Sequence, residues 1–140
     1  MKKKSGAEAN QGKRCDVVMD ARKKHPPGER PFDPVLAVQF EGERWLARQA
    51  ASAGFELARG PVDLVGEDGL LEEVERSALR VDGYRLHRLQ RKNEVPIRFS
   101  TVDFEGVLIV RDPVRFLAKV ELGFGPQKAF GCGLMLLRRA

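Results

Sequence analysis

The order of elements along this 140-residue chain predicts an α+β domain with one antiparallel sheet and two helices on one face, the ferredoxin-like βαββαβ arrangement. Residues 41–53 carry apolar side chains at helical spacing, and residues 84–110 alternate as a long hairpin does. Asp112-Pro113 then gives the start signal of a second helix. The length and the 42% hydrophobic content fit one small domain with one core.

The N-terminal part contributes the first strand of this arrangement. Residues 1–12 are polar and are predicted to form a flexible basic N-terminus, so the domain is assigned to residues 13–140. Residues 14–19 form a short strand candidate because their character partly alternates. Residues 22–34 contain four prolines, which predicts a loop.

The middle of the chain contributes the first helix and a strand. The helix over residues 41–53 shows apolar positions at i, i+4 and i+7, and Gly54 is a natural stop. Residues 55–65 predict a strand, and residues 71–78 form an acidic segment whose structure the pattern leaves ambiguous.

The second half contributes the hairpin, the second helix and a last strand. The hairpin over residues 84–110 turns at residues 90–94, and the helix follows Asp112-Pro113. A glycine-rich segment comes next, and residues 132–138 form the last strand candidate. In the ferredoxin-like layout this last strand lies beside the first, so Cys15 and Cys132 are expected to be neighbours without a role.

Charge is distributed unevenly along the chain, whose net charge is +5. Residues 1–31 carry nine Lys/Arg against four Asp/Glu, residues 32–80 carry five against ten, and residues 81–140 carry eleven against six. Such runs are usually solvated faces. Two basic ends around an acidic middle indicate, in addition, one face that attracts a polyanion and another that stays acidic.

Composition argues against several classes of function. No stretch of about 18 apolar residues exists, and no basic segment is strongly amphipathic, so neither a membrane span nor a membrane-surface role is predicted. Two cysteines are too few for a disulfide framework, which favours a reducing, cytoplasmic setting. No Cys/His or carboxylate cluster has metal-ligand spacing, so neither a metal nor a cofactor is predicted.

The glycine-rich segment at residues 123–133 is the most informative motif. Its glycines let the backbone approach a bulky ligand or adopt positive φ, and successive amides in such a loop can favour an anion. The natural anion for a basic chain is a nucleic-acid phosphate. Gln127 and Lys128 are the loop positions expected to face it, and Lys128 adds a point charge. The four glycines of the motif are Gly123, Gly125, Gly131 and Gly133.

This motif, followed by the apolar-then-basic run at residues 134–140, resembles the C-terminal glycine-rich loop of the repeat-associated RNA-binding superfamily of CRISPR systems. It is most similar to the type I-E repeat-RNA endoribonucleases, the CasE class. Residues 104–113 resemble the strand-then-helix segment that precedes the loop in that family, and residues 45–55 resemble its helix-to-strand junction. The resemblance covers most of residues 13–140.

The hairpin carries the second candidate site. Its cations could engage phosphates on both sides of an RNA groove, or they could be solubilising charges on an exposed edge. The residues alone leave these two interpretations about even, and the resemblance favours RNA, because it implies that a basic hairpin holds the repeat stem-loop. The predicted RNA-binding residues of the hairpin are Arg85, Arg88, Arg91, Lys92 and Arg98.

The resemblance implies two tandem ferredoxin-like domains, of which this chain matches the second. It also implies metal-independent cleavage through a cyclic phosphate, with the catalytic histidine in the first domain. His25, His87 and Tyr84 match no catalytic position, so no catalytic residue is assigned. We therefore expect the chain to be a C-terminal, RNA-binding portion that meets a separate N-terminal half and other subunits of a type I-E complex.

Two alternatives within RNA biology stay open, namely an intact minimal endoribonuclease that uses His87 and a small non-catalytic RNA-binding module. A nucleotide-binding module is disfavoured, because the glycine loop precedes a strand instead of opening a helix. Phe124 and Phe130 beside the loop are expected to pack more than to stack on bases. Trp45 is expected to anchor the helix to the sheet.

Overall fold

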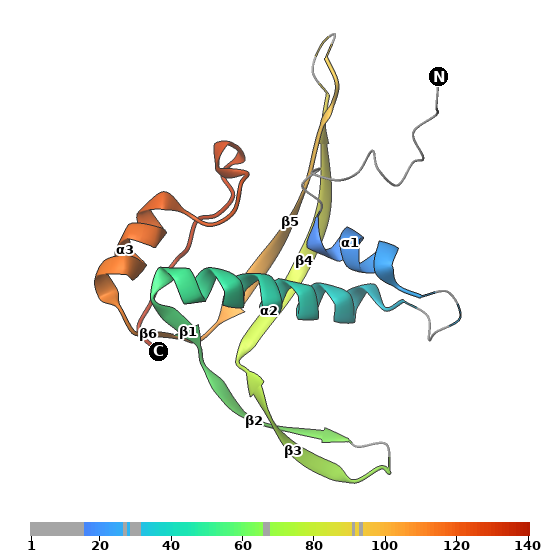
Figure 1. Cartoon of the computed structure of the whole chain (residues 1–140), viewed down its shortest axis with the longest axis vertical. Helices are drawn as coiled ribbons and strands as arrows, with labels where there is room; N and C mark the ends of the chain where they lie inside the picture. Colours follow the sequence, from blue (N-terminus) through green and yellow to red (C-terminus); the bar gives the residue numbers. More distant parts are fainter. Residues whose placement is uncertain (1–15, 27, 29–31, 66–67, 91, 93) are drawn as a thin grey trace, which may run out of the picture.

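A computed structural model describes residues 16–26, 28, 32–65, 68–90, 92 and 94–140 (Figure 1). The predicted flexible N-terminus at residues 1–12, Cys15 and the predicted contact residue Arg91 lie outside these residues. The elements are α1 (Val17–Lys24), α2 (Pro34–Ala53), β1 (Phe55–Leu57), β2 (Arg59–Val65), β3 (Leu71–Ser77), β4 (Leu79–Leu89), β5 (Ile97–Gly106), β6 (Leu108–Val110), α3 (Pro113–Leu122) and a short 3-10 turn, η2 (Lys128–Phe130).

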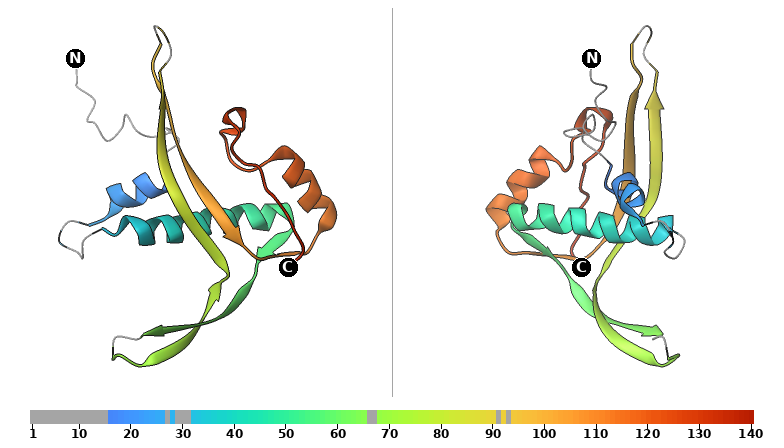
Figure 2. Two further views of the ribbon diagram at one scale, coloured as in Figure 1. Left: turned by 180° about the vertical axis from the view of Figure 1, so that it is seen from behind. Right: turned by 45° about the vertical axis from the view of Figure 1, so that its right-hand side comes forward.

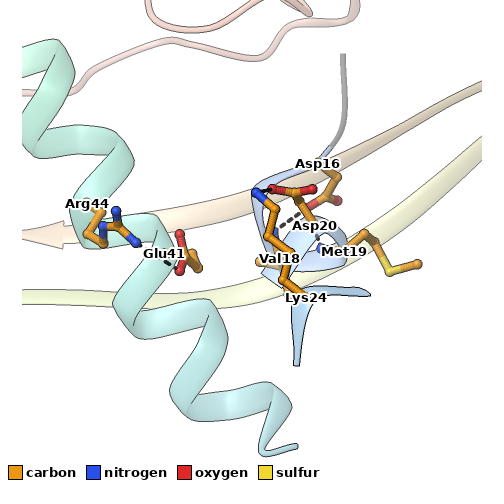
Figure 3. Close-up of polar contacts among 7 residues, drawn as sticks. All are labelled: Asp16, Val18, Met19, Asp20, Lys24, Glu41 and Arg44. Carbon is orange, nitrogen blue, oxygen red and sulfur yellow. Dashed lines mark hydrogen bonds and ion pairs between the residues drawn. The ribbon is translucent and has the colours of Figure 1, made fainter. Parts of the chain in front are cut away.

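The first element is a helix, so the strand predicted over residues 14–19 is wrong in its described part. Asp16 caps α1, because its Oδ1 accepts hydrogen bonds from the backbone N–H groups of Val18 (2.8 Å) and Met19 (3.4 Å), as Figure 3 shows. An aspartate that satisfies these free amides favours a helix start over strand pairing. Along the same helix the Lys24 ammonium pairs with the Asp20 carboxylate at 2.6 Å.

Helix α2 begins at Pro34, seven residues before the predicted start at residue 41, and it ends at Gly54 as predicted. Asp33 caps it by accepting from Val35 and Leu36, and Pro34 occupies its first turn. A proline there costs no intrahelical bond. The segment over residues 22–34, predicted to be a loop because of its prolines, therefore ends in the first residue of α2.

The strands meet in a three-way junction instead of one continuous sheet. Pairing is antiparallel throughout, in the pairs β1–β6, β2–β3 and β4–β5. The chain changes partner at Ala58, Ala78 and Val107, whose backbones bond in a ring: Ala58 N–H to Val107 C=O, Ala78 N–H to Ala58 C=O, and Val107 N–H to Ala78 C=O. A Cβ at Gly106 would lie 2.4 Å from the Ala78 oxygen, so this close approach requires glycine.

The predicted α+β class is confirmed, and the arrangement is consistent with a ferredoxin-like fold. The acidic segment that the sequence left ambiguous is strand β3. The last predicted strand, residues 132–138, is wrong, because this segment lies in no strand pair of the described residues. Without a first strand to pair with, it leaves Leu134 79% and Leu136 87% exposed.

Helix α2 crosses the centre of the molecule, and the two long hairpins leave it in opposite directions (Figure 1). The core gathers around α2, where Phe55 contacts the rings of Phe116 and Phe124 edge-on, at centroid distances of 5.5 and 6.2 Å. The predicted start of α3 is confirmed, since the Asp112 carboxylate accepts from the Arg115 N–H at 3.1 Å. No helix of the described residues is long and apolar enough to cross a membrane.

Candidate nucleic-acid interface

The β4–β5 hairpin is held firmly at its base. The side-chain amide of Gln39 on α2 donates to the Leu79 carbonyl (2.8 Å) and accepts from the Val81 N–H (2.9 Å), so it grips the β4 backbone as a neighbouring strand would. Val81 is buried against α2 beside Gly42, where an added Cβ would lie 2.5 Å from the Val81 Cγ1. Helix and hairpin therefore pack without room for a larger side chain at Gly42.

A second anchor joins the hairpin to α1. The Tyr84 hydroxyl donates to the Oδ2 of Asp16 at 2.6 Å, while the other oxygen of this carboxylate caps the helix. Burial, and then the adjacent Asp16 carboxylate, raise the pKa of Tyr84 well above its usual range. The neutral phenol thus joins the hairpin to the carboxylate that caps α1.

Beyond these anchors, the two strands carry cations on both faces. Arg88 lies directly opposite Arg98, and Arg85 lies opposite Thr101 on the other face. Like charges directly opposite each other on paired strands repel. No ion pair joins Arg85, Arg88, Lys92 or Arg98 to a carboxylate among the described residues. The hairpin therefore presents uncompensated positive charge, which an anionic ligand would neutralise.

The base of the same hairpin differs in charge from its outer part. There Arg80 pairs with Asp82, through its Nε at 2.7 Å, and lies within 4.0 Å of Glu105. Residues 85–98 carry five Lys/Arg against one Glu. Positive charge is thus concentrated away from the body of the molecule.

The glycine-rich segment forms a closed loop beside the hairpin. The Phe124 N–H donates to the Gly133 carbonyl at 3.0 Å, which joins the two ends of the segment. A Cβ at Gly133 would lie 2.1 Å from the Phe124 oxygen, and φ there is +86°. The closure thus requires glycine, whereas a Cβ at Gly131 would meet no atom within 4 Å. Gly123 and Gly125 also have positive φ, at 74° and 79°.

The predicted loop contacts lie on or beside the short turn η2. Lys128 is exposed and Gln127 is half-buried, and the Gln127 carbonyl accepts from the Phe130 N–H at 3.1 Å. Phe124 is buried in the core, as expected of a packing residue. Phe130 is not part of the core and remains 39% exposed.

A ladder of three rings joins the loop to the hairpin. The Phe130 ring stacks on Phe99, and Phe99 stacks on His87, with 4.9 Å between centroids and 19° between planes in each case. His87 Nε2 lies 2.9 Å from the Thr101 hydroxyl, which fixes the imidazole. The structure therefore brings together the two candidate regions, which are far apart in the sequence. The sequence analysis did not single out Phe99, because its partners become visible only with the strand register.

The other histidine lies elsewhere. His25 forms the C-cap of α1, and its ring meets Phe32 edge-on at 5.6 Å. Trp45 stacks on Phe104 at 5.7 Å and packs against the core, consistent with the expected anchoring role. Among the described residues, no group of three or more His, Cys, Asp or Glu side chains could hold a metal ion.

A groove in the body of the molecule is lined by none of the hairpin cations or ladder residues. It measures about 650 Å³ and is lined by residues of α2, β1, and the start of α3. Two of its three arginines are engaged, since Arg111 pairs with Glu56 at 3.1 Å and Arg115 donates to the Ser52 carbonyl at 2.9 Å. Its third arginine, Arg59, shares the wall with the carboxylates Glu43, Glu56 and Asp112, which make the groove a poorer phosphate site than the hairpin.

Fold and site define an α+β domain with a firmly anchored basic hairpin faced by a glycine-rich loop. The family model of the CRISPR associated protein family matches residues 7–139, so the chain belongs to that family, and the predicted membership is confirmed. The chain is also similar to the CRISPR-associated endoribonuclease Cse3 of Thermus thermophilus, with 38% identity over 103 residues.

That match covers 71% of this chain and 44% of the relative, so the chain spans less than half of the relative's length. No solved structure matches the chain.

Proposed function

We propose that this chain binds the stem-loop of CRISPR repeat RNA and serves as the RNA-holding half of a repeat-processing endoribonuclease of the type I-E system. The observation that carries the proposal is the cross-strand pair Arg88–Arg98, two cations held opposite each other without a described carboxylate partner. Such a pair is unfavourable alone and becomes favourable when a phosphate lies between or beside the two guanidinium groups.

Two further observations support it. The hairpin is anchored at its base by Gln39 and Tyr84, so it presents its cations as one rigid unit. The relative Cse3 is named as a CRISPR-associated endoribonuclease, which fits a partner that is RNA. Double-stranded RNA is recognised largely through its shape and its phosphates, which suits a cationic hairpin.

We assign no catalytic residue to this chain. The His87 ring is stacked on Phe99 and its Nε2 is within hydrogen-bond distance of Thr101, which suits a positioned structural side chain. Cleavage is proposed to need a further, N-terminal half, and other subunits of a type I-E complex are proposed partners. Arg85, Lys92, Gln127 and Lys128 are proposed as additional RNA contacts, as is Arg91 outside the described residues.

The test measures the affinity of a labelled repeat stem-loop for two double variants of the chain, one altered in the β4–β5 hairpin and the other in the β2–β3 hairpin. Arg88→Gln/Arg98→Gln removes two cations from β4–β5, and the matched control Arg59→Gln/Arg76→Gln removes two cations from β2–β3. We expect the first pair to weaken binding roughly 30-fold, at about 1 kcal/mol for each lost charge-assisted contact. The dependence of log K on log salt should also fall by about 1.5.

The control should bind within about twofold of the unmodified chain, because surface charges away from the contact act only weakly through salt. Equal losses in the two double variants would reject the hairpin as the RNA site. Cleavage is read on the same samples with a chelator present, and cleavage by this chain alone would show that its own side chains perform the chemistry.

A further inference from the structure

We propose that the His87–Phe99–Phe130 ladder is a stacking platform for an unpaired nucleobase next to the duplex that the hairpin holds. This inference rests on the proposed RNA binding and adds to it a distinct subsite with a distinct ligand. An aromatic ring offers its face to any base, so the subsite selects an unpaired nucleotide over a paired one, with little preference for its identity.

The ladder stands outside the core. None of its three rings belongs to the buried cluster or to the apolar side chains packed against it. The core rings of Phe55, Phe116 and Phe124 meet edge-on, whereas the ladder rings are nearly parallel. Nearly parallel rings at this spacing are offset-stacked, an arrangement that a further flat aromatic ring can extend.

The ladder ends at Phe130. Phe99 lies in the middle and contacts a ring on each face, whereas Phe130 contacts Phe99 alone among the described aromatic rings. Phe130 is 39% exposed. Phe99 stacks on one side of this ring, and the exposed part of Phe130 is where the proposed base would stack.

Two exposed cations belong to the same loop and hairpin as the ladder. Lys128 lies two residues before Phe130 on the same turn and is exposed. Alternate residues of a strand share a face, so Arg85 lies on the same hairpin face as His87. Phe99 lies directly opposite His87 on the paired strand and so belongs to that face as well. A nucleotide stacked on Phe130 would thus find cations for its phosphate on the loop and on the hairpin.

The base is proposed to be unpaired because a paired base is held within the helix, by stacking in the interior and by its base pair at the end. An unpaired flanking nucleotide can turn away from the stem and place its base on the Phe130 ring. The hairpin would hold the duplex through its phosphates, and the ladder would hold the first nucleotide beyond it.

The experiment compares two RNAs, namely one stem-loop with three unpaired nucleotides on each flank and the same stem-loop with blunt ends. We expect the unmodified chain to prefer the flanked RNA roughly 30-fold, the middle of the range for one stacked base. In Phe130→Leu the preference should disappear while the affinity for blunt RNA stays unchanged. The matched control is Phe40→Leu, a phenylalanine that is 62% exposed on α2, and it should keep the full preference.

A second measurement does not depend on any variant. With 2-aminopurine placed at each flanking position in turn, one position should lose fluorescence on binding to the unmodified chain as the base stacks. Equal affinity for flanked and blunt RNA, or no quenching at any position, would overturn the platform while leaving stem-loop binding intact. Failure to bind either RNA would overturn the proposed function together with the platform.

Discussion

The two long hairpins of this molecule are built from similar strands and differ in what holds them. Strands β4 and β5 are gripped by Gln39, clamped through Tyr84 and packed on α2 through Val81. Strands β2 and β3 pair over seven residues each, and nearly all their described side chains are exposed or half-buried on both faces. Figure 2 shows that the two hairpins leave the body in opposite directions.

Their charges differ as well. Residues 59–77 hold six Asp/Glu and two Arg, whereas residues 85–98 hold five Lys/Arg and one Glu. The basic hairpin is anchored, as a surface for a polyanion has to be if its cations are to keep their spacing. The acidic hairpin depends on its own pairing, and an isolated two-stranded hairpin is only marginally stable. Anchoring thus decides which hairpin is rigid, although strand pairing is similar in both.

The largest effect expected from this contrast is on stability, and one substitution made in each hairpin measures it. Val81→Ala should lower the free energy of unfolding by about 2 kcal/mol, because it removes buried methyl groups beside Gly42. Val74→Ala should cost at most about 0.5 kcal/mol, because Val74 is 37% exposed. Both variants replace a valine in a strand by alanine, so the change in β-propensity is the same in both and drops out of the comparison of their stabilities. Similar losses in urea unfolding would show that β2–β3 contributes to the core after all.

A smaller effect is expected at the Tyr84 clamp. Tyr84→Phe should lower stability by about 1 kcal/mol at about pH 8, because the Asp16 carboxylate loses a donor. The unfolded phenol ionises near a pH of about 10, and the pKa of Tyr84 is higher in the folded chain. The clamp therefore contributes fully below about pH 10 and is lost as the pH rises through the folded pKa.

Urea unfolding of both proteins at about pH 8 and at about pH 10.5 tests this sign. The stability difference between the unmodified chain and the variant should shrink at the higher pH. A difference that grows with pH would mean that the phenol is stabilised as the anion.

The smallest effect is expected from the acidic hairpin on RNA affinity. Glu73→Gln/Glu75→Gln removes two exposed carboxylates from β3. Because the hairpins point apart and the Debye length is about 8 Å at physiological salt, stem-loop affinity should rise less than about twofold. A change of tenfold or more would indicate that the RNA runs along both hairpins.

Several elements could be predicted from local residues because their signals are local. The stop at Gly54 and the start at Asp112-Pro113 depend on backbone chemistry within one turn, and both are confirmed. The hairpin over residues 84–110 followed from alternation, although its last three residues pair with β1. The α+β class follows from these elements together.

The same local reasoning failed where a signal has two meanings. Alternation at residues 14–19 suggested a strand, but the Asp16 carboxylate caps a helix there. The proline cluster suggested a loop, but Pro34 opens α2. The last strand, over residues 132–138, was expected to pair with the first, over residues 14–19. Because residues 17–24 form helix α1, that pairing partner is missing from the described residues.

By itself, then, the sequence determined the class of fold, the contrast between an acidic middle and a basic segment at residues 84–110, and the glycine-rich composition of residues 123–133. These follow from residue type and spacing alone. The tertiary structure decided the three-way change of strand partners, the grip of Gln39 on β4, and the meeting of Phe130 with Phe99. Each of these joins residues about twenty or more positions apart, and such contacts depend on the packing of the whole chain because no local propensity encodes them.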